Sequence, residues 1–135
     1  MKAIYVLSVK KLKRCYVGQT NDLRKRIVQH ANNLGARKHP IKALQMDFEK
    51  YGVEILKVYN CEALQDQERK IYEKVVMLLY LQKGWQLYNS LPKEEWLIES
   101  ILDDLQYRIE HIEFTHDNGE FVTVSREKDS LCNES

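Results

Sequence analysis

The chain has 135 residues, 44% of them hydrophobic and 30% charged, which suits one ordinary globular domain with at most a small appendage. No apolar run approaches the roughly 20 residues needed to span a bilayer, so we expect no membrane segment and an intracellular (cytoplasmic or nucleoid-associated) location. The three cysteines, Cys15, Cys61 and Cys132, are odd in number and widely spaced, which argues against a disulfide framework or a zinc finger.

The net charge is only +1, but it is unevenly distributed. From Met1 to Lys42 many Lys and Arg residues accompany a single acid, Asp22, whereas acids outnumber bases from Pro92 onward. Counterion release drives much of a protein's affinity for DNA, so a basic face favours nucleic-acid binding. We therefore expect such a face in the N-terminal part and a neutral to acidic C-terminal part.

The chain begins with two short runs that are rich in β-branched and aromatic residues. They span Ala3 to Leu7 and Arg14 to Gly18, and the polar loop from Lys10 to Lys13 separates them. Two such runs around a polar loop predict a β-hairpin with one tyrosine, Tyr5 or Tyr16, on each strand.

The second run leads into a turn and a basic helix. Gly18 tolerates a backbone that a residue with a Cβ would resist, and Thr20, Asn21 and Asp22 are good acceptors for the free amides of a helix start. In the helix that follows, His30 lies one turn beyond Arg26 on the same side. A tyrosine, an arginine and a histidine would thus converge beside a helix N-terminus, which favours phosphate. The alternative is an ordinary strand–turn–helix with a solvated basic face.

Apolar spacing predicts four more elements before Pro92: a helix from Ile41 to Lys50, a strand from Val53 to Tyr59, a long helix from Glu62 to Leu81 and an extended segment from Trp85 to Leu91. The strand alternates, with Ile55 and Tyr59 on one side and Leu56 and Val58 on the other, and we expect helices on both of its faces.

After Pro92 we expect a helix that opens at Lys93, followed by a second hairpin. Alternating runs at residues 112–115 and 120–124 flank Asp117-Asn118-Gly119, and Asn-Gly between such runs is a strong hairpin signal. The last residues are polar.

Three motifs of the N-terminal part, Ala3-Ile4-Tyr5, Tyr16-Val17-Gly18 and the run from Asn21 to Arg26, together resemble the GIY-YIG nuclease family. Ala3 stands where the family usually has glycine. The resemblance covers residues 1–92 and implies an α/β (α+β) fold, a small three-stranded, mainly antiparallel sheet flanked by helices. Residues 93–124 would then form a C-terminal extension of helix and hairpin, and residues 125–135 a polar tail.

The resemblance assigns catalytic positions to six residues: Tyr5, Tyr16, Arg26, His30, Glu68 and Asn89. One tyrosine would act as general base or orient water, and Arg26 would bind the scissile phosphate. Arg24 and Lys25 are expected to contact the nucleic-acid backbone, and His39 matches a second histidine of the homing-endonuclease branch. Gln19 departs from members that have lysine after the glycine, which removes one positive charge near the phosphate.

The resemblance also maps the family's metal-binding glutamate onto Glu68, with Asp66 and Glu62 as alternatives on the same helix and Glu73 less favoured. Mg²⁺ is often held by only one or two carboxylates and keeps several waters, so one glutamate is enough for Mg²⁺ or Mn²⁺.

The implied activity is a metal-dependent DNA endonuclease that hydrolyses phosphodiester bonds. The alternative is a non-catalytic module on the same scaffold that binds DNA or a protein, and RNA stays open as a substrate. The C-terminal extension would serve homodimerisation or a targeting partner.

Overall fold

The computed structural model describes residues 1–90, 112–118 and 121–126. Its elements, in chain order, are β1 (Ala3–Val9), a 3-10 turn (Lys10–Leu12), β2 (Arg14–Thr20), α1 (Leu23–Gly35), α2 (Lys42–Tyr51), β3 (Glu54–Asn60), α3 (Asp66–Gln82), β4 (Gln86–Leu87), β5 (Ile112–Asn118) and β6 (Phe121–Arg126).

The strands form one six-stranded sheet in the order β4-β2-β1-β3-β6-β5. Its centre is the expected antiparallel trio: β1 pairs with β2 on one side and with β3 on the other. The short β4 adds to β2 in parallel. The α/β fold class, with a mainly antiparallel sheet flanked by helices, is therefore confirmed.

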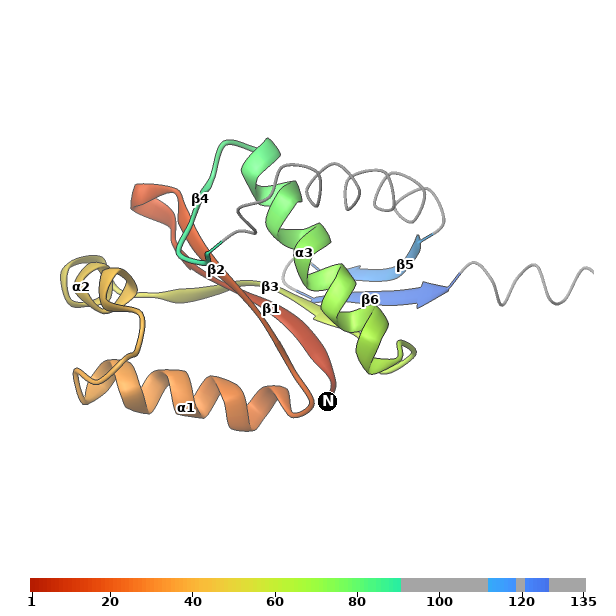
Figure 1. The fold of residues 1–135 in the computed structure, drawn as a ribbon, viewed down its shortest axis with the longest axis horizontal. Coiled ribbons are helices and arrows are strands. Elements are labelled where there is room, and N and C mark those ends of the chain that lie inside the picture. Colours follow the sequence, from red (N-terminus) through yellow and green to blue (C-terminus); the bar gives the residue numbers. More distant parts are fainter. Residues whose placement is uncertain (91–111, 119–120, 127–135) are drawn as a thin grey trace, which may run out of the picture.

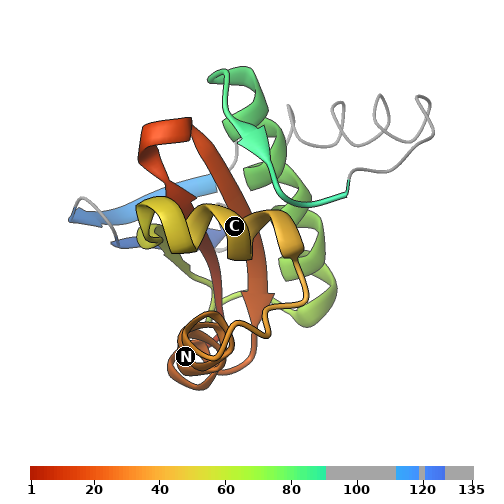
Figure 2. The same ribbon diagram turned by 90° about the vertical axis from the view of Figure 1, so that its left-hand side faces the viewer.

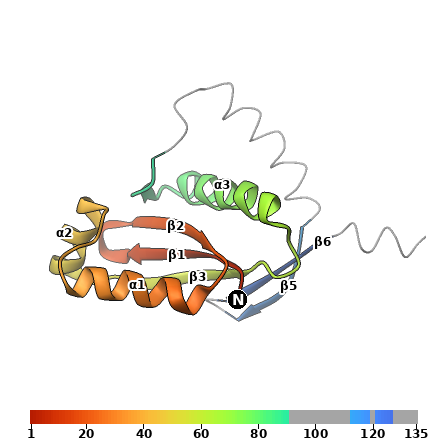
Figure 3. The ribbon, with the colours of Figure 1, turned by 60° about the horizontal axis from the view of Figure 1, so that its bottom comes forward.

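Among the described helices, one covers one face of the sheet, and two cover the other. Figures 1 and 3 show α3 on one face and α1 and α2 on the other. The side chains of β1 alternate accordingly, because Ile4 and Val6 pack in the cluster under α3 while Tyr5 and Leu7 pack in the cluster toward α1. Figure 2 looks from the side of α2, which lies in front of the strands. Tyr5, the first motif tyrosine, therefore lies between the sheet and α1.

The simple alternation expected for β3 is wrong. Its register against β1 shifts between Val6 and Leu7, whose partners are Lys57 and Ile55, so Leu56 is an extra residue in the ladder. As a result Leu56 packs on the α3 face together with Tyr59, instead of on the opposite face. A β-bulge of this kind bends a strand and re-aims its side chains.

The second hairpin is present and joins the same sheet. β5 and β6 pair antiparallel, with Asn118 opposite Phe121, and β6 runs parallel to β3. The expected helix from Lys93 and most of the polar tail lie outside the described residues. In the part of the chain that the structure describes, no helix has the length and apolar character needed to cross a membrane.

Candidate active site

Tyr5 and Gly18 lie directly opposite each other in the β1–β2 ladder. The prediction that Gly18 serves a special backbone conformation is wrong, since the described glycines with positive φ are Gly52 and Gly84. The reason is space: a Cβ at position 18 would lie 2.4 Å from both Cζ and the hydroxyl oxygen of Tyr5. Because Tyr5 is fully buried, only glycine lets its ring lie across β2.

The hydroxyl of Tyr5 meets two side chains of α1. His30 Nε2 lies 2.6 Å from this oxygen, and Arg26 Nε donates to it at 3.4 Å. Tyr16 lies beside the pair, with its ring centroid 6.2 Å from that of Tyr5 and 5.5 Å from that of His30. The four-residue spacing of Arg26 and His30 thus brings both side chains to one oxygen, and the structure gathers four of the sequence-derived candidates.

His39 extends this contact into a chain of hydrogen bonds. His30 Nδ1 and His39 Nε2 are 2.8 Å apart, and the amide of Ile41 donates to His39 Nδ1 at 3.1 Å. Both imidazole rings are buried and stacked, with their centroids 5.1 Å apart. His39 is therefore part of the site's interior, although a histidine in a basic loop is usually a surface residue.

Gln45 holds the loop that carries His39. Its Oε1 accepts from the amide of His39 at 3.1 Å, and its Nε2 donates to the carbonyl of Leu34 at 3.0 Å. The sequence alone assigns no role to Gln45. A polar residue at a position where the helical period places the core was the available signal.

Burial sets the protonation states of Tyr5, His30 and His39 in this chain of hydrogen bonds. It lowers the pKa of His30 to about 4, helped by the neighbouring His39 and Arg26, and it also lowers the pKa of His39. Burial raises the pKa of Tyr5 well above its usual value near 10, and the hydrogen bond from Arg26 only partly opposes this rise. At neutral pH both histidines are therefore uncharged and Tyr5 keeps its proton.

The lowered pKa of His30 makes the folded state sensitive to acid. Unfolded His30 takes up a proton as the pH falls through 6.5, while the native residue stays neutral until about 4, so stability is lost on acidification. We expect His30 to account for a loss of about 2 kcal/mol between pH 7 and pH 5. Urea denaturation of wild type and His30→Gln at both pH values measures this, and an unchanged pH dependence in the variant would contradict it.

Asn89, which follows α3, is hydrogen-bonded to the backbone of the Tyr16-Val17-Gly18 motif. Its Oδ1 accepts from the amide of Val17 at 2.9 Å, and its Nδ2 donates to the carbonyl of Val17 at 2.7 Å. The carboxamide thus mimics a strand neighbour of β2. Asn89 is therefore engaged with the backbone of the residue next to Tyr16.

The acidic residues around the start of α3 have separate roles. The helix begins at Asp66, so Glu62 precedes it, contrary to the prediction of one helix from Glu62. Glu62 accepts from the amide of Lys2 at 2.8 Å, and Asp66 lies 3.1 Å from Arg69.

Glu68 Oε1 accepts from the amide of Gln65 at 3.0 Å in a capping box. Glu73 is half-buried, and burial raises its pKa.

No group of three or more His, Cys, Asp or Glu residues among the described residues is arranged to hold a metal ion. Glu68 nevertheless suits a hard cation, because Mg²⁺ accepts carboxylate oxygen and needs only one or two protein carboxylates. Glu68 is half-buried and supplies carboxylate oxygen, the donor type that such an ion takes.

A pocket of about 350 Å³ opens next to Arg26. It is lined by polar and charged residues of the β2–α1 connection and the first turns of α1: Gln19, Thr20, Asn21, Asp22, Lys25, Arg26 and Gln29. Asp22 is the only acid among the described residues that line it, and one oxygen of that carboxylate accepts from the amide of Lys25 at 3.2 Å as the helix cap. Arg24 is exposed on α1 but does not line the pocket. The lining therefore carries more positive than negative charge, and we call this hollow the anion pocket.

The sheet with its tyrosine pair, the arginine and histidine on α1 and the anion pocket define a nuclease-type domain. The family model of the GIY-YIG catalytic domain matches residues 1–86, and the chain belongs to this family, whose members are generally endonucleases. No curated protein and no solved structure matches the chain.

Proposed function

We propose that the protein is a metal-dependent endonuclease that hydrolyses phosphodiester bonds of DNA. The observation that carries the proposal is the hydroxyl of Tyr5, which meets His30 and Arg26 beside the anion pocket. Hydrolysis requires a group that takes a proton from water and cations that stabilise the charge developing on the phosphate.

The amide of Ile41 fixes the direction of the histidine chain. An amide N–H only donates, so His39 Nδ1 must accept from Ile41 and, in the neutral ring, the proton of His39 is on Nε2. That proton faces His30 Nδ1, so the proton of neutral His30 is on Nε2 and points at the oxygen of Tyr5. His30 is therefore a donor to Tyr5, not the base that deprotonates it.

Two donors, His30 and Arg26, thus converge on the oxygen of Tyr5 and stabilise its ionised form. In the proposed step, Tyr5 phenolate takes a proton from a water as that water attacks phosphorus, and the bond from phosphorus to the leaving oxygen breaks on the opposite side. Solvent water protonates the leaving oxygen, and Tyr5 returns its proton to solvent before the next turnover. The raised pKa keeps the phenolate scarce at neutral pH. The small fraction of Tyr5 that is ionised then limits the rate.

The remaining candidates bind the substrate in this proposal. Arg26 lines the pocket and is suited to a phosphate oxygen as well as to Tyr5, because guanidinium donates in several directions. Lys25 and Arg24 are exposed on α1 and contact neighbouring backbone phosphates. DNA is the substrate we favour, and RNA is the alternative. Cleavage assays on both nucleic acids distinguish the two.

Glu68 would hold Mg²⁺ or Mn²⁺, and the ion would supply a positive charge for the phosphate oxygens. The test is nicking of supercoiled plasmid with Mg²⁺, with Mn²⁺ and with chelator, by wild type and Glu68→Gln. Glutamine also completes a capping box, so this variant removes the charge while it preserves the start of α3. We expect metal-dependent nicking that falls at least about 100-fold in the variant.

Unchanged nicking by Glu68→Gln would remove the metal role from this residue. DNA binding without nicking by the wild type would instead favour the non-catalytic module. We also propose that the C-terminal extension engages a second copy or a targeting partner, because β5 is the last strand of the sheet in the described part of the chain and sheet edges pair readily with other chains. Analytical ultracentrifugation with and without residues 93–135 tests self-association.

A further inference from the structure

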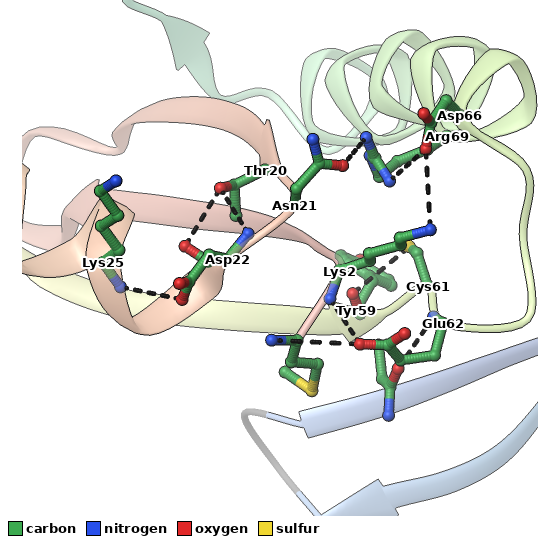
Figure 4. Close-up of polar contacts among 12 residues, drawn as sticks. Lys2, Thr20, Asn21, Asp22, Lys25, Tyr59, Cys61, Glu62, Asp66 and Arg69 are labelled. Carbon is green, nitrogen blue, oxygen red and sulfur yellow. Dashed lines mark hydrogen bonds and ion pairs between the residues drawn. The ribbon is translucent and has the colours of Figure 1, made fainter.

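Arg69 of α3 is a buried cation directly behind the anion pocket. Only 3% of the residue is exposed, and its guanidinium reaches across to the β2–α1 connection, as Figure 4 shows for Asn21. Nε donates to Oε1 of Gln19 at 2.7 Å, and one terminal nitrogen, Nη2, donates to Oδ1 of Asn21 at 2.6 Å. Burial of a charge is costly unless it is compensated, so the surroundings of Arg69 need an explanation.

The charge of Arg69 is paired with one partly solvated acid. Gln19 and Asn21 are uncharged, and the nearest acid is Asp66, whose Oδ1 lies 3.1 Å from Nη1. Asp66 is 63% exposed and is also 4.0 Å from Lys2 Nζ, so one solvated carboxylate is shared by two cations. Nη1 is buried, and its contact with Asp66 does not have hydrogen-bond geometry. The guanidinium therefore lies behind the pocket with a single acid that it shares with Lys2.

Arg69 also fixes how the two amides face. A guanidinium has only donors, so both side chains must turn their oxygen toward Arg69, and neither amide can flip without losing its bond. Their NH₂ groups then point away from Arg69, as Figure 4 shows for the nitrogen of Asn21. Both residues line the pocket. Arg69 thus orients both amides, so that their NH₂ donors face away from the guanidinium and its positive charge lies behind them.

We infer that Arg69, Gln19 and Asn21 form a second phosphate cradle, which holds a backbone phosphate of the nucleic acid next to the phosphate bound by Arg26. The inference rests on the proposed function for its ligand class. Gln19 occupies the position where a lysine charge was expected from the family resemblance. Arg69 of α3 brings a positive charge next to that position, because its Nε donates to Oε1 of Gln19, and Gln19 lines the pocket.

The test is binding in the absence of cleavage. A fluorescein-labelled 20-base-pair DNA duplex is titrated with the full chain in EDTA at several NaCl concentrations, and fluorescence anisotropy gives the Kd. The variants are Gln19→Glu and Asn21→Asp, which keep an acceptor for Arg69 while they replace an NH₂ donor by a charged oxygen. Substitution of Arg69 itself is avoided because its side chain is buried.

Gln86→Glu is the matched control. Oε1 of Gln86 also accepts from an arginine Nε, that of Arg14, at 3.0 Å, and the residue does not line the pocket. We expect Gln19→Glu and Asn21→Asp each to weaken binding about tenfold and to lower the salt slope by about one, whereas Gln86→Glu changes the Kd less than about twofold.

Equal affinities of Gln19→Glu, Gln86→Glu and wild type would overturn the cradle, as would a wild type that does not bind the duplex. Failure of the proposed function is a separate result. A wild type that binds DNA and loses affinity in the cradle variants, but does not cleave in Mg²⁺, would leave the cradle standing and refute the nuclease.

Discussion

Replacement of Tyr5 with phenylalanine is expected to lower the single-turnover rate of plasmid nicking about 1,000-fold. The substitution removes one oxygen, the atom on which His30 Nε2 and Arg26 Nε converge, while the buried ring stays in place. A positioned proton acceptor typically contributes 10²- to 10⁴-fold, and no other described side chain receives both donors.

DNA affinity separates this effect from a loss of binding. Tyr5→Phe should bind a labelled duplex in EDTA within about threefold of wild type, because Arg26, Lys25 and the cradle are untouched. Tyr51→Phe, at the exposed end of α2, is the control and should cleave like wild type. Cleavage by Tyr5→Phe within about tenfold of wild type would show that the hydroxyl takes no proton in the reaction.

Gly18→Ala is expected to impair both stability and cleavage, although it adds a single methyl group. The new Cβ would lie 2.4 Å from Tyr5 Cζ and from its hydroxyl oxygen, and the buried ring has no room to retreat. Overpacking of a rigid interior costs about 1–3 kcal/mol, and displacement of a catalytic group by about 1 Å costs about 100-fold in rate. Urea denaturation and single-turnover nicking measure the two effects.

Gly35→Ala is the matched control for that substitution. Gly35 ends α1, a Cβ there meets nothing within 4 Å, and alanine favours helices over glycine. This variant should be at least as stable as wild type and equally active. If Gly18→Ala behaved in the same way, the close contact between β1 and β2 would not be what requires glycine.

The elements that depend on local patterns were predictable from the sequence. Apolar alternation and polar loops marked both hairpins, and the spacing of Arg26 and His30 on α1 predicted that they would face the same side. Tyr5 and Tyr16 were found because their motifs recur in a known family. Each of these signals is contained in one short stretch of the chain.

The features that depend on distant contacts were not predictable. Gly18 is required because of Tyr5 on another strand, and the shifted register of β3 becomes visible only opposite β1. Arg69 reaches Gln19 across 50 positions of sequence, so its charge could not be assigned to the pocket. The direction of the histidine chain follows from one backbone amide, that of Ile41, which no side-chain pattern reveals.

The pH profile of single-turnover plasmid nicking in Mg²⁺ tests the central claim, that Tyr5 phenolate receives the proton of the attacking water. Burial raises the pKa of Tyr5, so the phenolate fraction grows with pH throughout the range from 7 to 9. The account predicts a rate that rises about tenfold per pH unit over this range and depends on the metal ion. A rate that levels off near pH 7, or the absence of metal-dependent nicking, would contradict it.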